Sequence, residues 1–209
     1  MAGELLEDIR LFLPRYLNPE HQAELFEAIK QFPDNKDYYL GRQYYQHDLL
    51  QGDGWCGFVA INFHSGDRKT VTGLVLSNTC DIDIKNPRNA DPNIIFVPLI
   101  KLARFKQILL EAGKADADVM NKVDAIRSQR TTSIFYLPEL PEVIEESMVL
   151  LDDLHQHPLS NFHATDKSKV FTLNQYAFYL FLVKLSIHFT RFSEDLSRYP
   201  EARNTPDAA

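Results

Sequence analysis

The chain has 209 residues, of which 44% are hydrophobic and 24% are charged, a composition typical of a globular protein that buries its own core. Its formal net charge of −7 argues against a nucleic-acid binder with a broadly basic surface, although it is compatible with a local basic patch. Two cysteines, an acidic first segment and the lack of any apolar run of about 20 residues predict a cytoplasmic protein without disulfides or a membrane span.

Residues 1–50 predict two helices, which end before Pro33, and a connector that packs on the rest of the domain. The connector is rich in turn residues. It carries four tyrosines: Tyr38, Tyr39, Tyr44 and Tyr45. We expect these rings to pack the connector onto the domain, with stacking on nucleobases as the alternative.

Residues 51–160 predict short strands interrupted by a helical insertion. Five β-branched or aromatic runs are bounded by turn residues: 56–63, 71–78, 93–99, 131–137 and 146–154. The segment HSGDRK (64–69) predicts a hairpin loop, and helical spacing predicts a helical hairpin at about 101–130. The glycine-rich stretch GDGWCG opens a strand rather than a helix, so we expect neither a phosphate loop nor a cofactor.

Residues 161–209 predict one helix with Thr172 as its candidate N-cap, followed by a tail. Aromatic residues surround this helix, so it should be buried on most sides, within the domain or in a homodimer. Together these elements predict an α+β fold in one domain: a small antiparallel β-barrel decorated by N-terminal helices, an inserted helical hairpin and a C-terminal helix.

Four motifs follow one another in a recognisable order: QGDGWCGFVAINF, TGLVLSN, IIFVPL and ESMVLLDDLHQHPL. In this order they resemble the PemK/MazF family, SH3-like barrels best known as toxin endoribonucleases. The resemblance covers residues 51–99 and 131–159. The stretches VLSNTCDI and FYLP also resemble an uncharacterised bacterial set of such proteins. The resemblance implies an SH3-like barrel whose groove binds RNA or a protein partner.

The sequence departs from that family where the family places its catalytic cation. The toxins carry an arginine directly before a proline, and here Val71 and Thr72 stand at that place. A Thr or Ser that follows the later VP strand in the toxins is replaced by Ile100 and Lys101. Cleavage of RNA needs a base for the 2′-hydroxyl and a cation for the developing phosphorane charge. The resemblance without the arginine therefore implies a binding module rather than an enzyme.

A group of polar residues follows the run GLVLSN. We call it the polar knot, and it consists of Ser77, Asn78, Cys80, Asp81 and Asp83. In one interpretation, which we favour, Asn78 and Asp81 organise a turn through their own backbone, and Cys80 is a half-buried filler. In the other interpretation these side chains line a pocket opposite the third strand and bind a ligand.

The residue types of the polar knot suggest three kinds of chemistry. A phosphodiesterase would use Asp81 as base and Lys69, Arg68 or Arg130 as cation. A Cys80 nucleophile is disfavoured because the neighbouring Asp81 opposes thiolate formation. A metal held by Cys80, Asp81 and a histidine is disfavoured as well, because His155, His157 and His163 lack the tight ligand pairs of zinc sites. We expect no metal, and we expect His155 and His157 to point the same way into solvent.

Three functions remain open. The first is a catalytically inactive binding or interaction module, in a toxin–antitoxin or phage-defence setting. The second is a metal-independent endoribonuclease with a relocated active site, formed by Asp81 with Lys69 or Arg130. The third is a structural protein whose terminal helices form an oligomer interface.

Overall fold

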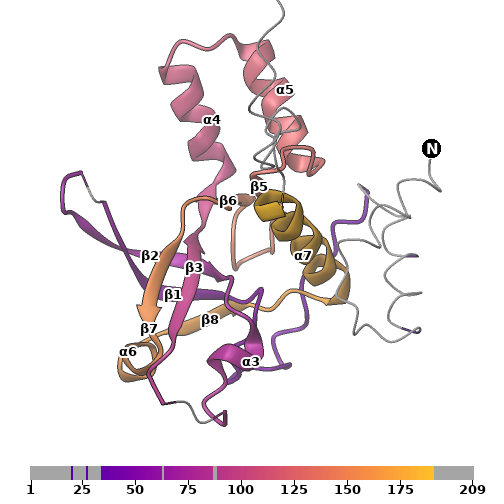
Figure 1. Cartoon of the computed structure of the whole chain (residues 1–209). Coiled ribbons are helices and arrows are strands. Elements are labelled where there is room, and N and C mark those ends of the chain that lie inside the picture. The colour runs from indigo at the N-terminus through magenta and orange to yellow at the C-terminus, as the bar shows by residue number, and fades with distance from the viewer. Residues whose placement is uncertain (1–19, 21–26, 28–33, 63, 87–88, 191–209) are drawn as a thin grey trace, which may run out of the picture.

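The computed structural model describes residues 34–62, 64–86 and 89–190, together with Glu20 and Glu27. The two helices predicted before Pro33 and the predicted tail after Thr190 lie outside the described residues. The described residues contain five helices and two antiparallel sheets (Figure 1), which confirms the α+β class.

The larger sheet has five antiparallel strands in the order β7-β3-β2-β1-β8. Its strands are β1 (Gly54–Ile61), β2 (Arg68–Val75), β3 (Asn93–Pro98), β7 (His155–Pro158) and β8 (Ser168–Phe171). The strands β1 and β2 form the predicted hairpin, and in its loop the N–H of Asn62 donates to the carbonyl of Asp67 at 2.9 Å. Strand β2 begins before its apolar run, because pairing with the end of β1 includes Arg68, Lys69 and Thr70. Strand β1 begins two residues before its run, at Gly54, which pairs with Leu74.

The smaller sheet has three antiparallel strands in the order β4-β6-β5. Its strands are β4 (Ile100–Lys101), β5 (Ile134–Leu137) and β6 (Ser147–Leu150). Strand β3 runs into β4 through Leu99, whose N–H donates to the carbonyl of Thr72 at 2.8 Å. Within the described residues neither sheet closes on itself, so the predicted closed barrel is not formed there. The chain instead passes from one sheet to the other at Leu99.

The inserted residues form the helical hairpin α4 (Leu102–Glu111) and α5 (Asp116–Arg127), which projects away from the sheets in Figure 1. Arg127 anchors its base. The Nε and Nη2 atoms of Arg127 donate to the two carboxylate oxygens of Glu146, each at 2.7 Å, and Tyr136 Oη donates to the same carboxylate at 2.5 Å. This bidentate pairing lowers the pKa of Glu146. It also ties the helical hairpin to the start of β6.

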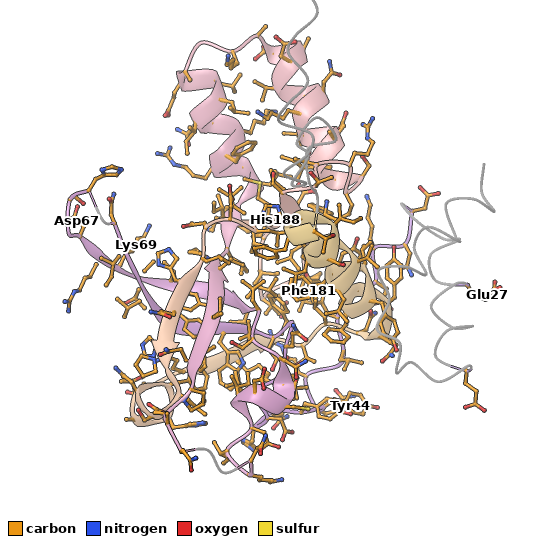
Figure 2. The ribbon with its side chains drawn as sticks, in the orientation of Figure 1. Glu27, Tyr44, Asp67, Lys69, Phe181 and His188 are labelled. Atoms are coloured by element: carbon orange, nitrogen blue, oxygen red, sulfur yellow. The ribbon has the colours of Figure 1, made fainter. Side chains whose placement is uncertain are left out.

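Helix α7 (Gln175–Thr190) packs into the domain, as its all-round apolar sequence predicts. Its buried residues are Tyr176, Ala177, Tyr179, Phe181, Val183 and Lys184. Figure 2 shows Phe181 pointing from α7 into the core. The predicted Thr172 cap is wrong: Asn174 caps the helix, because its side-chain oxygen accepts from the N–H of Ala177 at 3.0 Å.

Two phenylalanine rings form the centre of the larger sheet. Phe58 and Phe96 stack with their centroids 4.1 Å apart and their planes at 10°. His155 stacks on Phe96 and His157 packs edge-on against Phe58, with centroids 5.6 and 6.2 Å apart. The prediction that both histidines are solvated is wrong: strand β7 brings both onto the core rings, and His157 is buried. The predicted common direction of the two side chains agrees with these contacts.

Two short helices complete the described fold, α3 (Thr79–Ile82) and α6 (Leu159–Ala164). Each follows a strand of the larger sheet, α3 after β2 and α6 directly after β7. Among the helices of the described residues, none is both long and apolar enough to cross a membrane.

Candidate functional site

The polar knot forms a hydrogen-bonded turn around α3. The side-chain oxygen of Asn78 accepts from the N–H of Cys80 at 2.9 Å and so caps the helix. Asp83 accepts from the N–H of Lys85 at 2.8 Å, and Asn86 Nδ2 donates to the carbonyl of Cys80 at 3.0 Å. The prediction that Asn78 organises a turn is confirmed. The half-buried position predicted for Cys80 is wrong, because this residue is exposed at the helix surface.

Ser77 links the ends of strands β2 and β3. Its Oγ accepts from the N–H of Ile95 at 2.7 Å, and its own N–H donates to the carbonyl of Ile95 at 3.3 Å. These bonds extend the pairing of β2 with β3 beyond the last strand residue. The polar knot therefore begins where the hydrogen bonding between β2 and β3 ends.

The three proposed catalytic residues do not form one site. Lys69 and its neighbour Arg68 lie at the start of β2, on the hairpin that Figure 2 labels at Lys69, whereas Asp81 follows the end of that strand. Six residues of extended chain separate Lys69 from Val75, about 20 Å at the usual rise of a strand. Arg130 follows α5, and its Nε donates to Ser128 Oγ at 2.8 Å. The structure therefore gives Asp81 no cation from Lys69.

A groove runs between β2 and the loop that precedes β6. We call it the β2 groove. It is a cavity of about 460 Å³ lined by Lys69, Thr70, Val71, Thr72, Leu99, Lys101, Glu139, Glu142, Val143, Ile144, Glu145 and Ser147. Val71 and Thr72 form part of its wall.

The charges of the β2 groove are predominantly acidic. Three carboxylates, from Glu139, Glu142 and Glu145, face two ammonium groups, from Lys69 and Lys101. Lys101 lies 2.5 Å from Glu145 and is neutralised by it. The carboxylates that remain outnumber the remaining cation, so this groove attracts cations more than phosphates.

A second cavity, the β8 pocket, lies on the other side of the same loop and has a volume of about 530 Å³. Its lining residues are Leu40, Gly41, Arg42, Tyr44, Gln46, His47, Leu140, Glu142, Val143 and the consecutive residues 169–172. Glu142 and Val143 line both the β2 groove and the β8 pocket. The two cavities therefore meet at these two residues, and the β8 pocket also carries the cationic side chains of Arg42 and Lys169.

A buried ion pair supports the β8 pocket. Lys169 Nζ lies 2.7 Å from Asp53 Oδ2, and the Asp53 side chain has no exposed surface. Asp53 Oδ2 also accepts from the N–H of Leu50 at 2.8 Å, and Trp55 Nε1 lies 3.4 Å from it. Burial raises the pKa of the Asp53 carboxyl, and the neighbouring ammonium of Lys169 opposes that rise. The other carboxylate oxygen, Oδ1, has no hydrogen-bond partner among the described residues.

The same lysine holds the connector in place. Lys169 Nζ donates to the carbonyl of Tyr45 at 2.6 Å, and Tyr45 has a φ of 52°, a left-handed conformation that is uncommon for a tyrosine. The connector thereby turns over the pocket and exposes Tyr44 and Tyr45, which are 54% and 53% accessible. The prediction that the connector tyrosines pack is confirmed for Tyr38 and Tyr39, which lie in and against the core, and is wrong for the other two.

A third cavity of about 300 Å³ adjoins α3. Its lining residues are His47, Asp48, Leu49, Leu50, Trp55, Thr79, Ile82, Asp83, Ile84, Lys85, Phe162, His163, Thr165 and Lys167. Of the predicted binding residues only Asp83 lines it, and the opposite wall comes from α6 rather than from β3. Lys167 Nζ lies 5.4 Å from the centroid of the Phe162 ring and so covers part of this wall.

The sequence reasoning missed Asp53, Lys169 and Glu142. Asp53 lies between Gly52 and Gly54 at the start of β1. A carboxylate between two glycines at the start of a strand is the feature that could have indicated it. Lys169 lies in β8, a strand that the sequence does not predict, because residues 161–209 were expected to form one helix and a tail. In the described residues no cluster of His, Cys, Asp and Glu has the geometry of a metal site, and Cys56 and Cys80 are not joined by a disulfide.

The chain matches no known protein family and no curated protein. The site must therefore be interpreted from its own geometry.

Proposed function

We propose that the protein is a divergent relative of the PemK/MazF barrels that acts as a non-catalytic interaction module, and that its β2 groove binds a basic segment of a partner protein. One observation carries the proposal. Where the toxins hold a phosphate with arginine, the groove presents Val71 and Thr72 in a wall that also carries Glu139, Glu142 and Glu145, the last of them paired with Lys101. Such a wall repels a phosphate backbone and attracts lysine or arginine.

The strand arrangement supports the relationship to SH3-like barrels. The chain passes from the larger to the smaller sheet between β3 and β4, and returns from the smaller to the larger between β6 and β7. Two such passages bend one set of strands around a common interior, as small barrels do. In a toxin–antitoxin or phage-defence setting, the partner segment would correspond to an antitoxin-like tail.

The second candidate, an endoribonuclease with a relocated active site, is favoured by a single observation. Lys69, Thr70 and Thr72 all line the β2 groove, and a lysine there could contact a phosphate. For the oligomerisation hypothesis the support is divided: the described domain buries Tyr176, Ala177, Tyr179, Phe181 and Val183 of α7, whereas Phe189 near its end is exposed.

The proposal is tested by titrating the protein with a fluorescent heptapeptide of alternating lysine and valine. We expect binding that weakens as salt rises from 50 to 200 mM, and an affinity about tenfold lower in the double variant Glu139→Gln/Glu142→Gln. Glu111→Gln, at the far end of α4, is the matched control and should leave the affinity unchanged. The absence of peptide binding, or tighter binding of a single-stranded RNA of similar length, would overturn the proposal.

A further inference from the structure

Strand β2 is the central strand of the larger sheet, yet it has two neighbours along only part of its length. On one side β1 pairs with it from Arg68 to Leu74, whereas on the other side β3 pairs only with Gly73, Leu74 and Val75. The chain then leaves the larger sheet at Leu99 and enters β4, and the hairpin of β1 and β2 extends past it (Figure 1). Among the described residues, the first half of β2 is therefore a sheet edge.

The hydrogen bonds of β2 indicate which backbone groups face this edge. The N–H of Val75 donates to the carbonyl of Asp53 on the β1 side, and the N–H of Leu99 donates to the carbonyl of Thr72 on the β3 side, at 2.9 and 2.8 Å. Odd-numbered residues of β2 thus point their backbone groups toward β1, and even-numbered residues point theirs to the opposite side. The N–H and the carbonyl of Thr70 therefore face the open edge.

This open edge lies in the β2 groove. Lys69, Thr70, Val71 and Thr72 all line the groove, and Arg68, Lys69 and Thr70 are exposed. A row of unpaired N–H and carbonyl groups on an exposed edge is a template for an added strand. The groove to which the proposed function assigns a basic segment therefore also offers backbone pairing.

The two faces of this edge meet different parts of the protein, because side chains alternate between the faces of a strand. Val71 packs against the hydrophobic cluster that contains Val75, so the odd-numbered side chains share one face. Leu74 belongs to another cluster, and Leu140 and Ile144 pack against that cluster. The loop before β6 therefore lies on the face of the even-numbered side chains of β2.

The carboxylates of the groove come from that loop. One of the three is paired with Lys101, which leaves Glu139 and Glu142. The cation Lys69 is an odd-numbered residue and so lies on the opposite face. Arg68 lies at the outer end of β2 and does not line the groove. A strand added here would therefore meet carboxylates on one face and, on that face, a cation only at its end.

We propose that an extended segment of the partner protein adds to this edge of β2 as an antiparallel strand in line with β3, and that basic residues at every second position of the segment face Glu139 and Glu142. The intervening residues are apolar and lie beside Val71 on the other face. Antiparallel pairing is the more stable kind per residue and is the kind found throughout this sheet. This inference rests on the proposed function, because it takes the same basic segment in the same groove. It adds the mode of binding and the sequence pattern of the segment.

The first measurement is amide hydrogen exchange in the full chain, labelled with ¹⁵N and without a ligand. We expect the amide of Thr70 to exchange fast, and the amides of Lys69 and Val71, which point toward β1, to be protected. A protected Thr70 amide would mean that residues outside the described ranges, or a second copy of the chain, cover the edge. That result would overturn strand addition.

The second measurement titrates the labelled chain with the heptapeptide of alternating lysine and valine. We expect the largest amide shifts at residues 68–72. In an antiparallel pair, the residues that lie opposite Arg68 and Thr70 share their face and exchange backbone hydrogen bonds with them, so the lysines of the peptide donate to β2. N-methylation of the lysine amides should therefore abolish these shifts, whereas N-methylation of the valine amides should leave them. Shifts that survive methylation at the lysines would overturn the proposal.

A heptapeptide of four lysines followed by three valines is the matched control, because it has the same composition without the alternation. It should bind about tenfold more weakly. Equal affinity of the two peptides, with shifts at residues 139–145 and none at residues 68–72, would overturn strand addition and leave the interaction module standing. No binding of either peptide would overturn both proposals.

Arg68 reports the direction of the added strand. In an antiparallel strand the last residues of the peptide lie opposite Arg68, at the start of β2. The alternating peptide with glutamate in place of its last lysine should therefore bind more tightly than the peptide with glutamate in place of its first lysine. The opposite order of affinities would overturn the antiparallel alignment.

The variant Thr70→Pro removes the N–H that faces the edge, at a position where a strand tolerates proline. It should lower the affinity for the alternating peptide about tenfold, whereas Thr70→Ala, which keeps the N–H, should leave the affinity unchanged. The amide spectrum of each variant should match the wild type away from residues 68–72. Unchanged affinity in a folded Thr70→Pro variant would overturn strand addition, and if this variant does not fold, the N-methylated peptides decide.

Discussion

The ammonium of Lys169 lies 2.7 Å from the carboxylate of Asp53, and this pair joins the last strand of the larger sheet to the entrance of β1. Lys169 Nζ also donates a hydrogen bond to the carbonyl of Tyr45. One side chain therefore couples the sheet edge, a buried acid and the connector that forms the rim of the β8 pocket.

Loss of this cation should destabilise the protein strongly. The substitution Lys169→Met leaves the Asp53 carboxylate buried without its counter-ion, and we expect a loss of about 3–5 kcal/mol in the free energy of unfolding. Urea denaturation measures it. Lys122→Met, on the exposed surface of α5, is the control and should change the free energy by less than about 0.5 kcal/mol. Equal effects of the two substitutions would show that the pair is unimportant.

The same variant should acquire a characteristic pH dependence. Burial already raises the pKa of Asp53, and removing Lys169 raises it further, so the folded state of Lys169→Met retains a proton that the unfolded chain releases above about pH 4. Stability should fall as the pH rises from about 4 to 7, and it should fall more steeply than in the wild type. Urea midpoints at pH 5, 6 and 7 test this. Parallel slopes in the two proteins would contradict it.

A second buried lysine, Lys184, should make the free energy of unfolding depend on pH in the alkaline range. Lys184 is only 5% exposed, and its Nζ donates to the carbonyls of Gln129 and Thr131 at 2.8 and 2.5 Å. Burial lowers its pKa to about 8, whereas the unfolded chain keeps the ordinary value near 10.5. The unfolded state then binds more protons between these values, so stability gains about 3 kcal/mol from this group as the pH rises from 8 to 10.5.

The measurement compares wild type with Lys184→Met by urea denaturation across that range. The difference in free energy between the two proteins should grow in favour of the wild type with rising pH, and Lys122→Met should show no such growth. A difference that does not change with pH would mean that Lys184 has an ordinary pKa in the folded protein.

Gly73 should not tolerate a side chain. A Cβ at this position would lie 2.6 Å from Phe96 Cδ2 and 2.8 Å from Phe58 Cδ2, within the stacked pair at the centre of the sheet. Gly73→Ala should cost about 1–3 kcal/mol of stability through overpacking. Thr70→Ser, an exposed change in the same strand, is the control for thermal unfolding. An unchanged melting temperature in Gly73→Ala would show that the rings move aside freely.

The sequence was sufficient for the local elements. The hairpin loop after β1 and the helical hairpin were predictable because turn residues and helical spacing determine them locally. The role of Asn78 was predictable for the same reason, since a cap depends on neighbours two or three residues away. The cap of α7 was misassigned by two residues, because Thr172 and Asn174 are both suitable and only the chain path decides between them.

The features that depend on contacts distant in sequence were not predictable. His155 and His157 are polar, and only their pairing opposite Phe96 and Ile94 places them on the core. The pair Asp53–Lys169 joins residues more than 100 positions apart, and no local sequence pattern predicts it. Proximity in sequence was also misleading for Lys69 and Asp81, because one extended strand separates them.

The most direct test of the central claim, that the protein binds without cleaving, is incubation of a mixed-sequence RNA with the folded wild type beside Lys69→Ala and Asp81→Ala. A ribonuclease of known activity shows that the RNA is cleavable, and circular dichroism shows that each protein is folded. We predict the same intact RNA with all three proteins. Sequence-specific cuts by the wild type that disappear in Lys69→Ala or in Asp81→Ala would contradict the account and establish an active site on this chain.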